Sequence, residues 1–462
     1  MPATAIVLAA GEGTRMKSAH AKVTHKLLGL PLVTWVVRSA KEAGCERVIV
    51  VVGNGADEVR SILEPEGVEF VEQTERLGTG HAVRCVRDAV GELSGPTVVL
   101  SGDSPLVRPQ TIASLIATAT EAHNACTVLA MEPADPTGYG RLDVDAAGQV
   151  TAIIEHKDCT PEQRESLTLC NSSIYCFCGR RLSAGLDLIG NDNVQGEYYL
   201  TDMVGIFVGQ GEPVAYLRAE DDSELLGINS RSQLAAASKV MQRRINEELM
   251  AAGVTMIDPD LVWAGPDVTV GRDTTIYPMT FLNGSTTIGE DCVVGPNTRL
   301  TNCTVGNACT VDETVGVDAV MDNEVSCGPR AYLRPGTHLL DGSKAGTHVE
   351  IKNSTIGRGS KVPHLSYIGD TTMGEGVNIG AGSITCNYDG YHKSPTVIGD
   401  NVFVGSDTMM VAPVKIGDGA LVGASSCITK DVPDNALALE RNDQVNLEDY
   451  ARLRRERIEK GL

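Results

Sequence analysis

The pattern of hydrophobic positions changes near the middle of the chain. Up to about residue 229, short runs of aliphatic and β-branched residues alternate with amphipathic stretches. Residues 5–8, 47–52 and 97–100 are apolar enough to form strands that are buried on both faces, and residues 32–42 have helical spacing. This alternation predicts an α/β domain with a Rossmann-like, mostly parallel sheet, whose ligands bind at the carboxyl ends of the strands.

From about residue 254, a period of six replaces the helical pattern. Inward aliphatic residues recur six places apart at Ile398, Val404, Met410, Ile416, Val422 and Ile428. Small or β-branched residues follow four places later at Val402, Thr408, Val414, Ala420, Ser426 and Val432. Hexapeptide periodicity of this kind is typical of a parallel β-helix, in which each unit forms one short strand and one corner. We therefore predict three segments: a nucleotide-binding domain over 1–229, a connecting helix over 230–253, and a β-helix with a tail over 254–462.

The six-residue pattern weakens in two places, 332–352 and 386–395. Interruptions in a solenoid usually form loops on its surface, often on the binding surface. We expect these two segments to carry the chemistry of the second domain.

Composition narrows the possible partners. The formal net charge is -21, from 39 Lys and Arg against 60 Asp and Glu, which argues against a general nucleic-acid-binding or anionic membrane surface. The 13 cysteines are scattered and form no CxxC pair. Neither a secretory signal nor an apolar run of membrane-spanning length is evident. These features favour a cytoplasmic protein with reduced thiols.

A glycine-rich turn, Gly11-Glu12-Gly13, follows the first predicted strand. Such a turn lets backbone N–H groups approach phosphate oxygens, although a GxG sequence alone is more often an ordinary tight turn. Met16 stands where a dinucleotide fingerprint has its third glycine. The nearby cations Arg15 and Lys22 favour a triphosphate. A second glycine-rich turn over 73–80 and the Gly-Asp pair at 102–103 complete the pattern.

The segments LAAGEGTRM, QTERLGTGHA and the Gly-Asp pair resemble sugar-1-phosphate nucleotidyltransferases. Together with the β-helix, residues 4–441 resemble the family of bifunctional N-acetylglucosamine-1-phosphate uridylyltransferases/glucosamine-1-phosphate N-acetyltransferases. The resemblance implies a left-handed β-helix, UTP and acetyl-CoA as co-substrates, Mg²⁺ as cofactor, and a homotrimer. It also implies a product, UDP-N-acetylglucosamine, that serves peptidoglycan and lipopolysaccharide synthesis.

The resemblance also assigns residues of the first site. Asp103 and Asn229 would bind Mg²⁺, which prefers oxygen ligands. Arg15 and Lys22 would hold phosphates. The whole set for nucleotide and sugar is Leu8, Ala9, Ala10, Gly11, Arg15, Lys22, Gln73, Gly78, Thr79, Ser101, Gly102, Asp103, Gly140, Glu155, Asn171 and Asn229.

Simpler interpretations of two of these residues stay open at this point. Asp103 follows a strand and is also suited to capping a helix, and Lys22 is also typical of a solvated surface lysine. Two residues depart from the family pattern. Ala21 stands where proline is usual, which puts the rigidity of its loop in doubt, and Ser101 replaces a residue that is more often Tyr or Pro.

In the second domain, His364 is the candidate catalytic base, because an ammonium group must lose a proton before the amine can attack a thioester. We expect Glu350 to orient the imidazole or balance its charge. The resemblance assigns Arg334, Glu350, Lys352, Tyr367 and Asn378 to the sugar phosphate. It assigns Ala381, Asn387, Tyr388, Ser406, Ala424 and Arg441 to acetyl-CoA, with Asn387 and Tyr388 also near the sugar.

Two competing hypotheses remain. In one, the chain has only the nucleotidyltransferase activity and its β-helix oligomerises or binds an effector. In the other, the protein binds nucleotide sugars without catalysis and needs no metal. The basic tail, with Arg452, Arg454, Arg455, Arg457 and Lys460, fits a solvated helix; a place near the 3′-phosphate of CoA is the weaker alternative.

Overall fold

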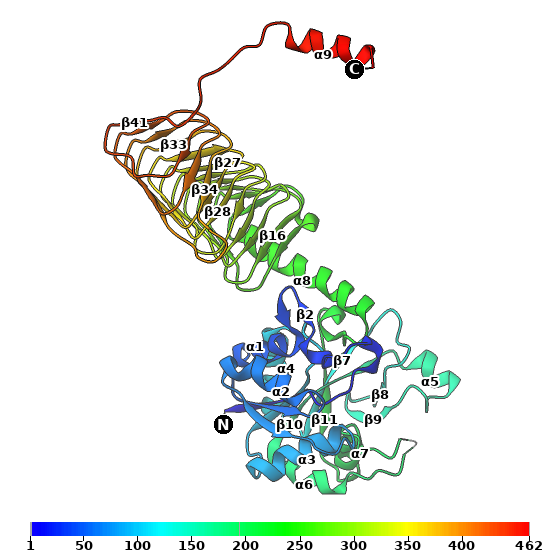
Figure 1. Ribbon diagram of the computed structural model, residues 1–462. Coiled ribbons are helices and arrows are strands. Elements are labelled where there is room, and N and C mark those ends of the chain that lie inside the picture. The colour runs from blue at the N-terminus through cyan, green and yellow to red at the C-terminus, as the bar shows by residue number, and fades with distance from the viewer. Residues whose placement is uncertain (1, 194, 462) are drawn as a thin grey trace. The chain divides into compact units, whose positions relative to one another are not determined.

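The structure, a computed structural model, describes residues 2–193 and 195–461 (Figure 1). It divides into two compact units, Met1–Arg244 and Ile245–Leu462. Within the described ranges, no helix is long and apolar enough to cross a membrane.

A nine-stranded sheet forms the centre of the first unit. Strand β1 (Ala3–Leu8) lies between β4 (Cys45–Val52) and β6 (Pro96–Ser101) and is parallel to both. The three strands predicted from the sequence are therefore confirmed. The remaining strands are β5 (Glu69–Glu72), β7 (Cys126–Met131), β8 (Arg141–Val144), β9 (Val150–Ile154), β10 (Cys170–Cys178) and β11 (Val214–Arg218). Of these, β10 runs antiparallel to β6 and β7, so the sheet is mostly but not wholly parallel.

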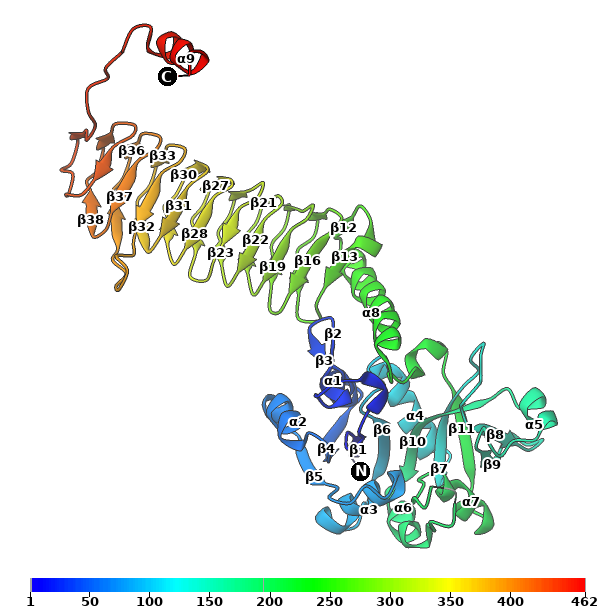
Figure 2. The same cartoon turned by 45° about the vertical axis from the view of Figure 1, so that its right-hand side comes forward.

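Helices cover both faces of this sheet, as Figure 2 shows. On one face, α1 (Leu32–Glu42), α2 (Ala56–Leu63) and α4 (Pro109–Glu121) contribute to the same apolar cluster as Val7 and Val50. On the other, α3 (Thr79–Val90), α6 (Gly179–Gly185) and α7 (Asp202–Gly209) pack with Ile6 and Val51. Adjacent residues of one strand thus enter opposite cores, which explains why the strand sequences are continuously apolar.

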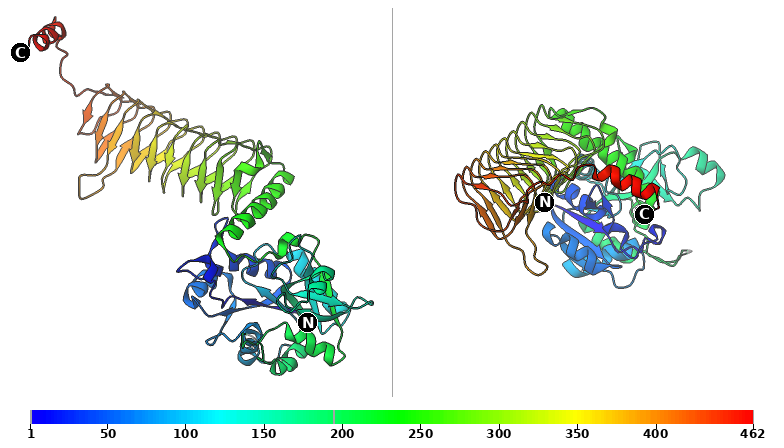
Figure 3. Two further views of the ribbon diagram at one scale, coloured as in Figure 1. Left: turned by 90° about the vertical axis from the view of Figure 1, so that its right-hand side faces the viewer. Right: turned by 45° about the horizontal axis from the view of Figure 1, so that its top comes forward.

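The second unit is a left-handed parallel β-helix with three faces (Figure 3). Each strand pairs in parallel with the strand one coil later. The first face runs from β12 (Thr255–Met256) to β41 (Leu437–Ala438), the second from β13 (Val262–Ala264) to β40 (Cys427–Ile428), and the third from β14 (Thr269–Val270) to β38 (Val414–Ile416). All six inward aliphatic residues of the predicted run are buried.

Asparagine and aspartate side chains link successive coils at the corners. The Asp400 carboxylate accepts a hydrogen bond from the Glu375 amide at 2.8 Å, and Asp418 accepts one from the Asp400 amide at 2.8 Å. Several corner residues have positive φ, for example Asn401 at 54°. Asn and Asp tolerate this conformation better than other non-glycine residues do, which explains their frequency in the second unit.

The structure corrects one of the two expected interruptions. Residues 332–352 do not leave the coil, because Leu333, Leu339, Ala345 and Ile351 are all fully buried at the regular six-residue spacing. The charged residues between them, Arg334, Asp341, Lys344 and Glu350, are partly or fully exposed. The second expectation is confirmed: after β34 (Ile384–Cys386) the chain forms a projecting loop, and the coil resumes at β35 (Thr396–Ile398) (Figure 2).

A long helix, α8 (Arg231–Ala251), spans the boundary between the units, and the predicted connecting helix is thus present. In the first unit, Arg244 donates to the Leu106 carbonyl at 2.6 Å. In the second, the Asn246 amide donates to the Val262 carbonyl at 2.9 Å. The tail ends in an exposed helix, α9 (Tyr450–Glu459).

We expect the β-helix to depend on its inward aliphatic residues. Ile288→Ala, within β17 (Thr287–Ile288), should destabilise the second unit by about 2–5 kcal/mol, because it opens a cavity in the coil. The outward neighbour provides the control, since Thr287→Ala should cost less than about 1 kcal/mol. Calorimetry of the full chain would measure both. Equal effects of the two substitutions would contradict an inward-facing Ile288.

Candidate active sites

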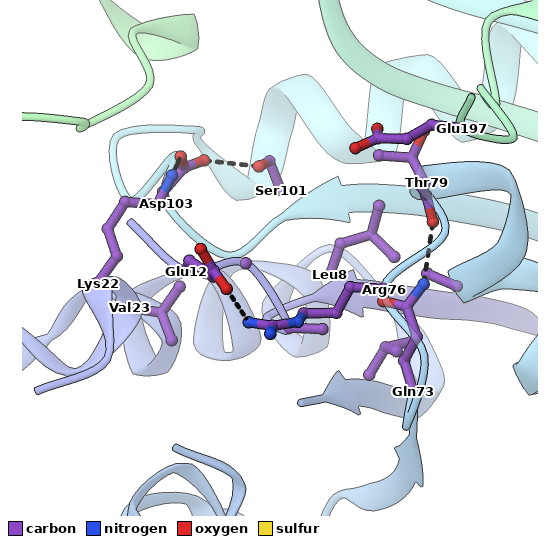
Figure 4. Close-up of a pocket in the computed structure, with 15 residues that line it drawn as sticks. Leu8, Glu12, Lys22, Val23, Gln73, Arg76, Thr79, Ser101, Asp103 and Glu197 are labelled. Carbon is purple, nitrogen blue, oxygen red and sulfur yellow. Dashed lines mark hydrogen bonds and ion pairs between the residues drawn. The ribbon is translucent and has the colours of Figure 1, made fainter. Parts of the chain in front are cut away.

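A cavity of about 680 Å³ opens at the carboxyl ends of the central strands (Figure 4). Nine of the residues expected in the first site line it: Leu8, Ala10, Gly11, Lys22, Gln73, Gly78, Thr79, Ser101 and Asp103. Ala9 and Gly102 are buried beside it, and the Gly102 amide donates to the Leu8 carbonyl at 2.9 Å. Arg15 is exposed and is not among the lining residues.

Close approach of the backbone explains two glycines in the turns beside this cavity. A side chain at Gly13 would collide with Lys22 Cβ, so the glycine-rich turn lies directly on the lysine stem. A Cβ atom at Gly78, where φ is 107°, would lie 2.5 Å from the Tyr198 carbonyl oxygen. Gln73 secures the second turn by donating to the Gly78 carbonyl at 3.0 Å, and α3 begins at Thr79. These contacts fix the backbone of both turns.

Lys22 lies between two oxygen atoms that come from distant parts of the chain. Its ammonium group donates to the Asp103 carboxylate and, at 3.0 Å, to Asn229 Oδ1. The lysine and aspartate side chains are only 15% and 12% exposed. Lys22 is therefore no solvated surface residue. The cap interpretation of Asp103 is also wrong, because α4 has Arg108 at its N-cap.

Ser101 supports the aspartate rather than disturbing it. Its hydroxyl donates to Asp103 Oδ1 at 2.5 Å (Figure 4). The serine at this position therefore orients the carboxylate through a hydrogen bond.

The same arrangement tests whether the site suits a metal ion. Asp103 and Asn229 turn one carboxylate and one amide oxygen toward a single point, and a cationic ammonium group already occupies that point. Two converging oxygen donors fit Mg²⁺, which keeps several of its own waters. No group of three or more His, Cys, Asp or Glu side chains suited to a metal occurs among residues 2–193 and 195–461, so any ion here would rely on water or ligand oxygens as well.

Three expected sugar-binding residues come together near β8 and β10. The Asn171 amide donates to the Gly140 carbonyl at 2.8 Å. A Cβ atom placed on Gly140 would lie 3.6 Å from Glu155 Oε1 and 3.7 Å from Asn171 Cβ. Burial raises the pKa of Glu155, and the charges of Asp158 and Asp202 act in the same direction. Glu155 therefore retains its proton to a higher pH than an ordinary glutamate, and in that form it can also donate a hydrogen bond.

Arg141, which the sequence analysis missed, holds the turn before Gly140. It is 1% exposed, and its guanidinium donates to the Pro136 and Tyr139 carbonyls at 2.8 and 2.5 Å. A buried arginine that donates to two carbonyls of one turn fixes the backbone there. Arg76 and Glu12, also missed, form a 2.5 Å ion pair at the first cavity, and Glu197 lines it as well.

In the second unit, Arg334, Glu350 and Tyr367 follow one another along the second face. Arg334 donates to Glu350 at 2.8 Å, and Glu350 pairs in register with Tyr367 on the next coil. The strands are β28 (Glu350–Lys352) and β31 (Tyr367–Gly369), which lie side by side in Figure 2. The expected partner of Glu350 was an imidazole, but the structure pairs this carboxylate with a guanidinium.

His364 lies at a corner of the coil. It ends β30 (Lys361–His364) on the first face, and Leu365, with φ of 46°, turns the chain onto the second face. Both side chains are exposed. Asn378, in β33 (Asn378–Ile379), lies one coil further along the first face and pairs in register with Lys361. The imidazole is thus available to a ligand and lies beside a polar face.

Asp370 connects residues that the sequence assigns to different ligands. Its carboxylate accepts hydrogen bonds from Lys352 at 2.8 Å, Asn353 at 2.7 Å and Asn387 at 2.6 Å. Asn387 in turn donates to the Tyr367 hydroxyl at 3.4 Å. Sequence analysis missed Asp370 because it occupies a corner position with positive φ, where aspartate is common for conformational reasons alone.

Four residues expected to bind acetyl-CoA follow one another along the coil. The Asp407 amide donates to the Ala381 carbonyl at 2.7 Å, and the Ser425 amide donates to the Ser406 carbonyl at 2.8 Å. These bonds stack the corners of Ala381, Ser406 and Ala424. Arg441 donates to the Ala424 carbonyl at 3.2 Å. Tyr388 is exposed on the projecting loop, and its hydroxyl donates to the Gly390 carbonyl at 2.5 Å.

The comparisons with known proteins match each unit separately. Residues 5–226 match the MobA-like NTP transferase domain, and residues 395–430 match six repeats of the bacterial transferase hexapeptide. The chain is therefore a nucleotidyltransferase joined to a hexapeptide-repeat transferase.

Relatives over nearly the full length specify the family. The bifunctional protein GlmU of Carboxydothermus hydrogenoformans is 47% identical over 447 residues, which is 97% of this chain and 99% of the relative. GlmU of Heliobacterium modesticaldum is 48% identical, with 95% of each chain covered, and that of Streptomyces avermitilis is 47% identical, with 98% of this chain and 95% of the relative covered. The chain belongs to the bifunctional GlmU family.

We predict that Asp370 stabilises the second unit in a pH-dependent way. Burial opposes its ionisation, but hydrogen bonds from Lys352, Asn353 and Asn387 hold the pKa of Asp370 below its ordinary value. Its contribution to stability is therefore present above the ordinary aspartate pKa of about 3.9 and is lost as pH falls through the lower folded value. Asp370→Asn should lower the thermal midpoint most near pH 7, and the difference from wild type should shrink in acid.

Asp291→Asn is the matched control, because Asp291 is an exposed corner residue that also has positive φ. Its midpoint should follow the wild type at every pH. A difference between Asp370→Asn and wild type that stayed constant from pH 7 to pH 3 would show that the carboxylate charge is not responsible.

Proposed function

We propose that this chain makes UDP-N-acetylglucosamine in two steps, one on each unit. The β-helix transfers an acetyl group from acetyl-CoA to glucosamine-1-phosphate. The nucleotidyltransferase unit then transfers uridylyl from UTP to N-acetylglucosamine-1-phosphate. The observation that carries this proposal is the presence of two separate polar clusters, one around Lys22 and Asp103 and the other around Asp370, in a GlmU family member that matches its relatives over nearly their whole length.

In the uridylyl step, an oxygen of the sugar phosphate attacks the α-phosphorus of UTP, and pyrophosphate leaves. Both reactants are anionic, so the protein must neutralise charge and align them rather than supply a nucleophile. The turns at Gly11 and Gly78 would hold the uridine and the phosphates, with Arg15 and Lys22 as cations. Gly140, Glu155 and Asn171 would bind the sugar, and Arg141 would fix the turn that carries Gly140.

Asp103 and Asn229 would hold Mg²⁺, which would neutralise phosphate charge when bound. Because Lys22 occupies the point between these two oxygens, its ammonium group would have to turn toward the phosphates of UTP when the ion binds. The lysine thus keeps Asp103 paired with a cation until substrate arrives, which avoids an unpaired carboxylate in a nearly buried site.

In the acetyl step, the glucosamine amine attacks the thioester carbonyl while His364 takes its proton, and the thiolate of CoA leaves. Arg334 and Lys352 would hold the sugar phosphate, and Tyr367 and Asn378 the sugar itself. Glu350 would act through Arg334, whose guanidinium it contacts. The stacked corners at Ala381, Ser406 and Ala424, with Arg441, would form the acetyl-CoA groove, and Asn387 and Tyr388 lie where both ligands would meet.

The single-activity alternative, with a β-helix that serves only as a scaffold, does not explain the second cluster. The bond from Asn353 to Asp370 is of the corner type that recurs along the coil, but Lys352 and Asn387 donate to the same carboxylate as well. A coil held together by its aliphatic core and corner hydrogen bonds does not require these two further donors. The polar face is therefore better explained by a ligand.

The β-helix units are proposed to assemble as a homotrimer. Large apolar side chains are exposed on the coil, including Phe281, Tyr332, Leu365, Phe403 and Leu421. Exposed apolar rows of this kind usually meet another protein surface. His364 is exposed on one protomer, so a neighbouring protomer would complete the wall of its site. The 13 free cysteines fit the cytoplasm, the reducing compartment that the sequence favours.

Substitution of one residue in each site should separate the two activities. Asp103→Ala should abolish pyrophosphate release from UTP and N-acetylglucosamine-1-phosphate but leave acetyl transfer intact. His364→Ala should do the reverse, with thiol release from acetyl-CoA as the measurement. A general base contributes typically 10²–10⁴-fold, so the second loss should be of about that size. A variant that lost both activities, while still folded, would disprove independent sites.

Assembly should affect only one activity. Sedimentation equilibrium should give three times the 48.9 kDa mass of one chain. Dilution that dissociates the trimer should remove acetyl transfer, because its site would lose a wall, and should preserve pyrophosphate release. Retention of acetyl transfer by a monomer would show that one protomer holds the complete second site.

A further inference from the structure

A carboxylate outside the first cavity holds the segment that carries Lys22. Glu58, in the first turn of α2, faces a short 3₁₀ turn, Lys22–Thr24. Its Oε1 lies 3.1 Å from His20 Nδ1 and accepts a hydrogen bond from the Thr24 hydroxyl at 3.0 Å. Its Oε2 accepts a hydrogen bond from the Ala21 amide at 3.4 Å. One side chain therefore contacts residues on both sides of Lys22.

Two glycines bring the surrounding backbones into direct contact with this segment. Gly55, the N-cap of α2, has φ of 69°, and a Cβ atom placed there would lie 2.9 Å from Ala21 Cβ. On the other side, Gly13 leaves no room between its backbone and Lys22 Cβ. The segment is thus enclosed between the start of α2 and the glycine-rich turn, and Ala21 is 3% exposed. Small movements of α2 would be passed on to Lys22.

We propose that Glu58 is a positioning residue for the uridylyl reaction. It fixes the backbone around Lys22, so that the ammonium group of Lys22 reaches the point between the side-chain oxygens of Asp103 and Asn229. This inference rests on the proposed function. Glu58 does not line the cavity, and its side chain is 37% exposed, so it acts through the segment rather than on a substrate. Lys22 has four rotatable side-chain bonds, and a fixed backbone reduces the conformations that it must lose.

The geometry of Ala21 explains why this chain needs such a contact. Ala21 has φ of -57° and ψ of 141°, which lie within the range of proline. Proline at this position would fix φ through its ring but would remove the N–H that Glu58 binds. Its ring would also occupy the space in front of Glu58 Oε2, 3.4 Å from the Ala21 nitrogen. A proline at 21 and a carboxylate at 58 are therefore alternative ways to fix the same segment.

The test uses the full chain and a double substitution. Glu58→Ala should lower kcat/KM for UTP about tenfold, because Lys22 is no longer held in place. Its KM for acetyl-CoA should be unchanged, because that site lies in the second unit, and circular dichroism should match wild type if the first unit is folded. Ala21→Pro introduced into Glu58→Ala should restore most of the loss, since the vacated space accepts the ring and the ring fixes φ.

Asp57→Asn is the matched control, because Asp57 is also acidic, exposed and in the first turn of α2. It removes the same charge from the same helix end and should leave kcat/KM for UTP at the wild-type value. An equal loss in Asp57→Asn would assign the effect to helix charge. No loss in Glu58→Ala, or no recovery in the double variant, would overturn the proposal.

Amide hydrogen-exchange rates measure how firmly the segment around Lys22 is held, and this measurement does not depend on enzyme activity. The amides of residues 18–26 should exchange faster in Glu58→Ala than in wild type and should return toward wild-type rates, for the amides that remain, in the double variant. If the wild-type protein released no pyrophosphate, the proposed function would fail, yet these exchange rates would still test the contact. Unchanged exchange in Glu58→Ala would refute the positioning role itself.

Discussion

Backbone hydrogen bonding between parallel strands decides where the functional side chains lie in both units. In the first unit, β1 pairs with β4 and β6 in parallel, so the loops that follow all three strands open at the same edge. In the second, the pairing of Glu350 with Tyr367 places groups from successive coils next to each other. The residues of each cluster are far apart in the sequence, and the register between paired strands brings them close together in space.

Sequence periodicity was sufficient to predict the elements of this framework. Two patterns predict which residues are buried: strands that are apolar on both faces, and aliphatic residues six places apart. The structure confirms that these residues are buried. The prediction that residues 332–352 interrupt the coil was wrong, because packing in the core does not restrict which residue types occupy the outward positions. Their polar residues made a regular coil look irregular, while Leu333 and Ile351 kept their inward places.

The contacts within the sites were harder to predict. Glu58, Asp370 and Arg141 act on other protein groups. Nothing in their local sequence distinguishes them from any other carboxylate at a helix start, aspartate at a corner or arginine in a strand. The partners of Glu58 and Asp370 lie 15 or more residues away, as Asn387 does from Asp370. The partners of Arg141 are backbone carbonyls, which carry no sequence signal. Long-range partners of this kind become visible only when the register of the chain is known. The residues proposed to contact ligands, by contrast, lie in motifs that are recognisable from the sequence.

The stacking of coils has a consequence for how this unit can change in length. Each coil hydrogen-bonds to the one before it and the one after it, and the polar cluster and the proposed acetyl-CoA groove are confined to the coils from Arg334 to Arg441. Whole coils nearer the start, such as the one that carries Leu282 and Ile288, contribute inward packing but none of these groups. Gain or loss of complete turns there would alter the height of the prism and preserve the polar cluster, so natural insertions in this half should come in multiples of a full coil.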